Sequence, residues 1–114
     1  MLDFVLDARN GVQMATVTGV IAIDGIYLVE RDSGVVVSEG AHRRGTREDF
    51  PLFGRVTQWD DAVFDDSELE QLASEISAFA AELEPLASAV MMAVAGLCRA
   101  GSLMAGSRAR FLGD

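Results

Sequence analysis

Four aspartates within seven positions form a dense acidic group that could bind a hard cation. They are Asp60, Asp61, Asp65 and Asp66. Mg²⁺ and Ca²⁺ take oxygen ligands of this kind. The Asp-x-Asp-x-Asp-Gly spacing of a calcium-binding loop is absent, however, and acidic residues are favoured at the start of a helix. We therefore predict a capped helix start with solvated carboxylates and no metal site.

Trp59 precedes these aspartates, and Glu70 follows them inside the expected helix. Tryptophan is enriched among the residues that contribute most to protein–protein binding. The favoured interpretation of the side chain itself, however, is the alternative in which Trp59 is buried and packs its loop against the sheet. We expect a partner-binding surface made of Trp59, Asp60, Asp61, Asp65, Asp66 and Glu70.

The single histidine, His42, lies in a basic stretch, residues 41–47, with Arg43, Arg44 and Arg47. Guanidinium groups fit phosphate and carboxylate, so the stretch could hold an anion. It could equally form ion pairs with neighbouring acids, and both interpretations stay open. An enzyme that uses imidazole would need His42, but no nucleophile motif accompanies it. We therefore expect no catalytic residue.

Cofactor chemistry has no support in the sequence. The single cysteine, Cys98, excludes an internal disulfide and a multi-cysteine metal cluster, and its apolar neighbours indicate a buried, unreactive thiol. The glycines form neither a Walker loop nor a Gly-x-Gly-x-x-Gly element. We expect no cofactor.

The charge of the chain limits its partners. The 114 residues include 18 acids and 9 basic residues, all of them arginine, for a formal net charge of -9. Such a surface repels phosphate, which argues against nucleic-acid binding and favours a basic protein partner. The segment 48–84 holds 11 of the 18 acids and one arginine, Arg55, so the acidic character is local.

No basic residue precedes the apolar start of the chain, so we expect no signal peptide and a cytoplasmic location. Residues 85–98 are one of two uncharged stretches of 14 residues, the longest in the chain. Because about 20 are needed to span a bilayer, we expect no membrane contact and interpret this stretch as a helix.

The first forty residues carry a hairpin pattern. Runs rich in apolar and β-branched residues are separated by Asn10-Gly11, Asp24-Gly25 and Ser33-Gly34, which are favoured turn pairs. The pattern predicts an antiparallel meander of about four strands at residues 2–8, 14–23, 26–31 and 35–39. Residues 40–64 are irregular, with a short strand expected near 54–58.

The second half of the chain has helical periodicity. Apolar residues recur at alternating spacings of three and four from Leu69 to Leu97, and Pro85 interrupts them at a position suited to the first turn of a new helix. We predict helices at 66–84 and 85–100 and a final strand at 108–112. With strands first and helices after, the fold is α+β in one domain, residues 1–114.

The stretch from Phe50 to Leu72 and the terminal Arg-Phe-Leu-Gly-Asp are similar to short uncharacterised actinobacterial proteins. The two stretches cover roughly a quarter of the chain, and the matching positions are Pro51, Leu52, Asp60 or Asp61, Val63, Phe64, Phe111, Gly113 and Asp114. Asp65 stands where that pattern has a polar amide. The resemblance implies a bacterial origin and a helix after Phe64, and no chemistry.

These observations predict a small acidic protein-binding module, such as an immunity or antitoxin-like inhibitor of a basic enzyme. Residues 86–97 are apolar nearly all round, which is typical of a core helix or of a subunit interface. The alternative is therefore a self-associating assembly subunit of a phage or bacterial particle, with a homo-oligomer formed through 86–97.

Overall fold

A four-stranded antiparallel sheet forms one layer of the protein. The computed structural model describes residues 2–23 and 49–113, and the sheet order within them is β2-β1-β4-β3. The strands are β1 (Leu2–Asp7), β2 (Gln13–Val20), β3 (Ala62–Asp65) and β4 (Arg108–Leu112). The first and last described strands are therefore neighbours in the middle of the sheet.

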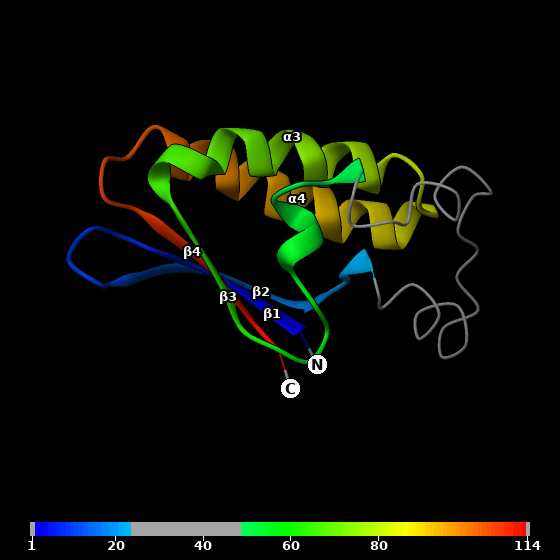
Figure 1. Ribbon diagram of the computed structural model, residues 1–114, viewed down its shortest axis with the longest axis horizontal. Coiled ribbons are helices and arrows are strands. Elements are labelled where there is room, and N and C mark those ends of the chain that lie inside the picture. The colour runs from blue at the N-terminus through cyan, green and yellow to red at the C-terminus, as the bar shows by residue number, and fades with distance from the viewer. Residues whose placement is uncertain (1, 24–48, 114) are drawn as a thin grey trace.

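Two helices, α3 (Leu69–Ala80) and α4 (Pro85–Ser102), lie side by side on one face of the sheet (Figure 1). Short 3₁₀ helices precede them, η3 at Phe53–Arg55 and η4 at Asp66–Glu68. The predicted α+β class, with an antiparallel sheet, two helices and a C-terminal strand, is confirmed.

The first two predicted strands and the turn between them are present. Gly11 has a φ of 84°, and the Val12 amide donates to Asn10 Oδ1. The second strand ends at Val20 and not at residue 23, because Val20 pairs with Leu2, where the partner strand β1 begins. Gly19, with a φ of 70°, lies at the register shift just before this pair. The strands predicted at 26–31 and 35–39 lie outside the described residues.

Two expectations for the segment 40–64 are wrong: the short strand near 54–58, and the irregular structure up to residue 64. The first region holds the 3₁₀ helix η3, and the strand β3 begins at Ala62. β3 has only four residues and no alternating run long enough to be recognised. It exists because it pairs with β4, with Phe64 opposite Ala109.

Pro85 separates the helices as predicted, although α3 ends at Ala80 and α4 continues to Ser102. The residue before a proline is disfavoured in helical geometry, and Glu84 is extended, with a ψ of 163°. Its carboxylate accepts the Ala87 amide at 2.7 Å and caps α4. Residues 81–84 therefore form a turn, and α4 runs back along α3.

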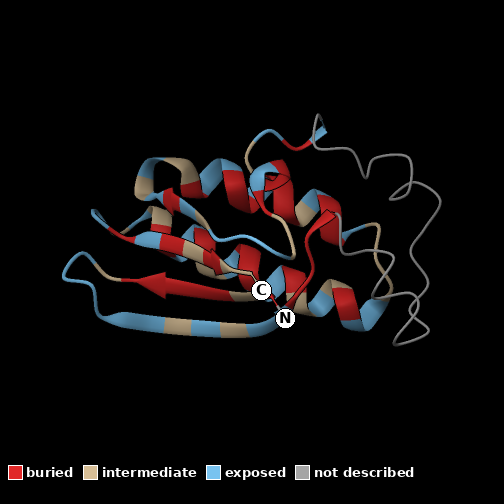
Figure 2. Ribbon diagram, turned by 60° about the horizontal axis from the view of Figure 1, so that its bottom comes forward, coloured by how far each residue is buried: buried red, intermediate tan, exposed pale blue. Residues whose placement is uncertain are grey.

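All six phenylalanines lie in the core between the helices and the sheet. The Phe111 ring is central: its centroid lies 5.2 Å from that of Phe4, 5.8 Å from Phe64 and 6.3 Å from Phe53. Phe53 in turn contacts Phe79 of α3 at 5.3 Å. Figure 2 shows the buried residues on the facing sides of the two layers.

Candidate functional site

The predicted helix cap is confirmed at Asp65. Its carboxylate accepts the Ser67 amide at 3.1 Å, and the Glu68 carboxylate accepts the Asp65 amide at 3.2 Å. This reciprocal pair is a capping box, which satisfies backbone donors that the first turn of a helix leaves unpaired. The role of Asp65 in this structure is to begin η4, the 3₁₀ helix that leads into α3.

Two other aspartates hold loops that are distant in sequence. Asp66 Oδ2 accepts the amide of Gly106, 40 positions away, at 2.6 Å. Asp61 Oδ1 accepts the amide of Gly113, 52 positions away, at 3.0 Å. These two bonds attach the chain before and after β4 to the two ends of β3.

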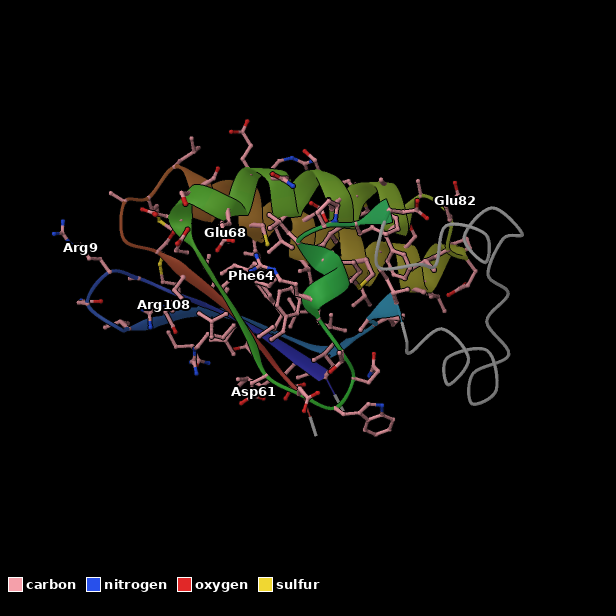
Figure 3. The ribbon with its side chains drawn as sticks, in the orientation of Figure 1. Arg9, Asp61, Phe64, Glu68, Glu82 and Arg108 are labelled. Carbon is pink, nitrogen blue, oxygen red and sulfur yellow. The ribbon has the colours of Figure 1, made fainter. Side chains whose placement is uncertain are left out.

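The six predicted partner-binding residues fall into two groups. One group precedes β3 and the other begins at its last residue, Asp65, so the four steps from Asp61 to Asp65 separate the groups by about 13 Å at the usual rise of a strand. The first group is Trp59, Asp60 and Asp61, and the second is Asp65, Asp66 and Glu70. In Figure 3, Asp61 and Glu68 mark the two ends. In the described ranges, no three potential His, Cys, Asp or Glu ligands come together.

The first group forms a turn, residues 57–61, which we call the Trp59 turn. Thr57 Oγ1 accepts the amides of Trp59 at 3.3 Å and of Asp60 at 3.0 Å, and the Thr57 hydroxyl donates to Asp60 Oδ2 at 3.4 Å. Gly113 lies against this backbone, since a Cβ there would be 2.6 Å from the Asp60 nitrogen. The hydrogen bonds to Thr57 and the packing of Gly113 therefore both hold the turn in place.

Trp59 is at the surface, with 57% of the residue exposed. The alternative in which it is buried against the sheet is wrong, because the hydrogen bonds of the turn involve its backbone and leave the indole outside the core. Asp60 and Asp61 beside it are also exposed. A large aromatic side chain is thus exposed next in sequence to two exposed carboxylates, on a hydrogen-bonded turn.

Two carboxylates of the second group also hold the fold. Asp65 and Asp66 accept the backbone bonds described above, while Glu70 is exposed in the first turn of α3. Arg55, the one arginine of the acidic segment, pairs with Glu68 at 2.6 Å and lies 4.8 Å from the centre of the Phe64 ring. Local ion pairing therefore offsets part of the charge at this end of β3.

Sequence reasoning missed two buried carboxylates. Glu75 Oε1 accepts the amides of Leu52 and Phe53, both at 2.9 Å, and so binds η3 to α3. Asp7 accepts from Arg110 across the sheet. A signal existed for Glu75, because it lies three residues after Leu72 and one before Ile76, on the apolar side of its helix.

An open hollow of about 300 Å³ lies where the β1–β2 turn meets the loop before β4. It is lined by Asp7, Ala8, Arg9, Asn10, Gly11, Gly106 and Arg108. The Arg9 side chain covers Gly106 and then extends outward, away from Arg108 (Figure 3). The two guanidinium groups do not converge on a common ligand position.

Cys98 is buried, as predicted, and burial raises the pKa of its thiol to about 12, with Arg99 opposing part of that shift. A thiol of this kind is protonated and unreactive at neutral pH. The other basic candidates, His42 with Arg43, Arg44 and Arg47, lie outside the described residues.

Helix α4 has one buried face and one exposed face. Met91, Val94 and Cys98 are fully buried, whereas Leu86 is 77% and Leu103 is 88% exposed. By length and composition, α4 is the one helix in the described part of the chain that could cross a membrane. A third of its residues are buried against the rest of the protein, and core helices of soluble proteins pass the same test.

No known protein family, no curated protein and no solved structure matches the chain. Residues of the stretch 50–72 and residues near the end of the described chain meet in space. Phe64 contacts Phe111, and Asp61 holds Gly113. Both stretches therefore take part in one structural unit around β3 and β4.

Proposed function

We propose that the protein is a binding module that docks on a basic surface of another protein through the Trp59 turn. The observation that carries this proposal is the exposure of Trp59, at 57%, on a turn held by the Thr57 hydroxyl and by Gly113. The backbone of the turn is already held by hydrogen bonds in the free protein. Binding a partner would therefore cost little conformational entropy.

The charge around the turn supports a basic partner. Asp60 and Asp61 directly follow Trp59 in the chain and are exposed, and the net charge of -9 would accelerate encounter with a positive surface at low ionic strength. Arginine is a suitable counterpart, because its guanidinium can stack on an indole and pair with a carboxylate.

In its specific form, the proposal is an inhibitor that covers the active site of a basic enzyme in the cytoplasm, as immunity proteins and antitoxins do. The small size, the local acidic charge and the absence of a catalytic constellation in the described residues support this form. The partner would be recognised by an arginine-rich surface.

The test is capture of a partner from a bacterial lysate at low ionic strength, followed by binding of the two purified proteins. We expect Trp59→Ala and Asp60→Asn each to weaken binding by at least tenfold, and added salt to slow association of the parent chain. Val12→Ala, which removes a remote apolar side chain that is 57% exposed, is the matched control. Equal binding by the parent and Trp59→Ala would refute the proposal.

The alternative function, an assembly subunit of a phage or bacterial particle, is favoured by a different observation. The exposed side of α4 is apolar over residues 86–97, with Leu86 77% and Met92 45% exposed. Light scattering over a range of concentrations tests it. A strict monomer at every concentration would exclude self-association.

A further inference from the structure

The exposed face of α4 has a regular composition. Five of its exposed positions and the exposed C-cap residue, Leu103, follow one another at spacings of three, four, three, four and three, which places them in one stripe along the helix. They are Leu86, Ala89, Ala93, Gly96, Ala100 and Leu103. The stripe carries no charged residue.

The order of these side chains is nearly the same in both directions. A leucine stands at each end and small residues stand between, so a point midway between Ala93 and Gly96 is a centre of symmetry. A two-fold interface brings the same patch of both subunits together and so requires a self-complementary surface. An antiparallel copy of α4 would place Leu86 of one chain beside the partner's Leu103.

We propose that two copies of the chain associate through this stripe, with their α4 helices antiparallel about a two-fold axis between Ala93 and Gly96. The small residues allow the helix backbones to approach closely, and a Cβ at Gly96 would meet no atom of its own chain within 4 Å. The two leucines of each chain would then cover each other at the ends of the contact.

The distribution of charge favours a second copy of the chain as the partner of this stripe, and it favours the antiparallel orientation. Residues 85–98 carry no charge in a chain of net charge -9, so two copies can meet here without apposing carboxylates. Glu84 caps the amino end of α4 and Arg99 lies in its last turn. Antiparallel pairing brings the acidic end of one helix toward the basic end of the other and also opposes the two helix dipoles.

The contact is small. Eighteen residues make a helix about 27 Å long. A pair of such helices buries less surface than a standard protein–protein interface, in which each partner buries about 800 Å². We therefore expect a dimer that dissociates on dilution. This inference rests on the self-association alternative above and is independent of docking through the Trp59 turn.

Cysteine cross-linking tests the orientation. Ala93→Cys should form a covalent dimer on mild oxidation, because the two copies of position 93 lie near the axis. Leu86→Cys alone should not, since its two copies would be about 25 Å apart along the helices. A mixture of Leu86→Cys and Leu103→Cys should give the mixed dimer. The parent chain, whose Cys98 is buried, is the control.

Sedimentation equilibrium tests the association itself. We expect the parent to dimerise with increasing concentration, Ala93→Glu to remain monomeric, and Ala78→Glu, at an exposed alanine of α3, to behave as the parent. Thermal unfolding of each variant establishes that it is folded. Ala93→Glu should still bind a basic partner of the Trp59 turn.

Three outcomes would overturn the pairing. If Leu86→Cys forms a cross-linked dimer with itself, the helices are parallel: self-association would be correct and the antiparallel geometry wrong. A monomer at all concentrations would contradict both the association and the geometry. A monomer that floats with phospholipid vesicles would instead assign the stripe to a membrane surface.

Discussion

The guanidinium of Arg110 donates from Nε to the Asp7 carboxylate at 2.6 Å, although the two residues are 103 positions apart in the chain. They belong to β4 and β1, the two central strands, and only 12% of the Asp7 side chain is exposed. This ion pair joins the first and last described strands on the face of the sheet opposite the helices.

Breaking the Asp7–Arg110 pair should destabilise the protein. Because Asp7 would be left buried without its donor, we expect Arg110→Gln to lower the free energy of unfolding by about 1–3 kcal/mol. Urea denaturation of Asp7→Asn, Arg110→Gln and the double variant measures the coupling between the two residues. Arg108→Gln, at an exposed arginine of the same strand, should change little. Additive effects of the two single changes would contradict the pairing.

Glu75→Ala should release η3 from α3. The substitution removes the acceptor of the Leu52 and Phe53 amides, and leaving these donors unpaired costs about 1–3 kcal/mol. Hydrogen exchange should accelerate at those two amides more than in β1. Glu75→Gln keeps one carbonyl oxygen and should have a smaller effect; equal losses from both variants would mean that the side chain acts through packing.

Gly113→Ala should displace the Trp59 turn. A Cβ at Gly113 would lie 2.6 Å from backbone atoms of Trp59 and Asp60, and backbone cannot move aside as a flexible side chain can. We expect a loss of about 1–3 kcal/mol and a shift of the fluorescence of the single tryptophan to longer wavelength. Gly96→Ala is the matched control: its surroundings are open and it lies within α4, so it should stabilise by about 0.5–1 kcal/mol.

The Cys98 thiol should make stability fall at high pH. Its pKa rises from 9.0 to about 12 on folding, so the native state keeps a proton that the unfolded state loses. The contribution is complete below pH 9.0 and is lost as the pH rises toward about 12. Denaturation of the parent and Cys98→Ala across this range measures it. A parallel decline in both chains would assign the effect to other groups.

Much of the local structure follows from neighbouring residues alone. The Asn10-Gly11 turn, the Asp65 cap and the helix break at Pro85 depend on backbone geometry and on hydrogen bonds within a few positions. Each of these was therefore predictable, as were the two helices, whose apolar residues repeat with the helical period.

The sheet neighbours and the candidate site depend on segments that are far apart in the chain. β3 is too short to signal itself and forms only because β4 returns beside it. Glu75 could be assigned a partner only once η3 lay against α3.

The density of aspartates around residue 60 was evident from the sequence, and so was the cap at Asp65. Only the tertiary structure separates these carboxylates into two groups, because Asp61 and Asp66 bond to loops 52 and 40 positions away. It also decides that Trp59 faces solvent, since Gly113 supports the turn from the opposite end of the chain. Local spacing determines where a helix begins, but the exposure of a side chain depends on which distant residues pack beside it.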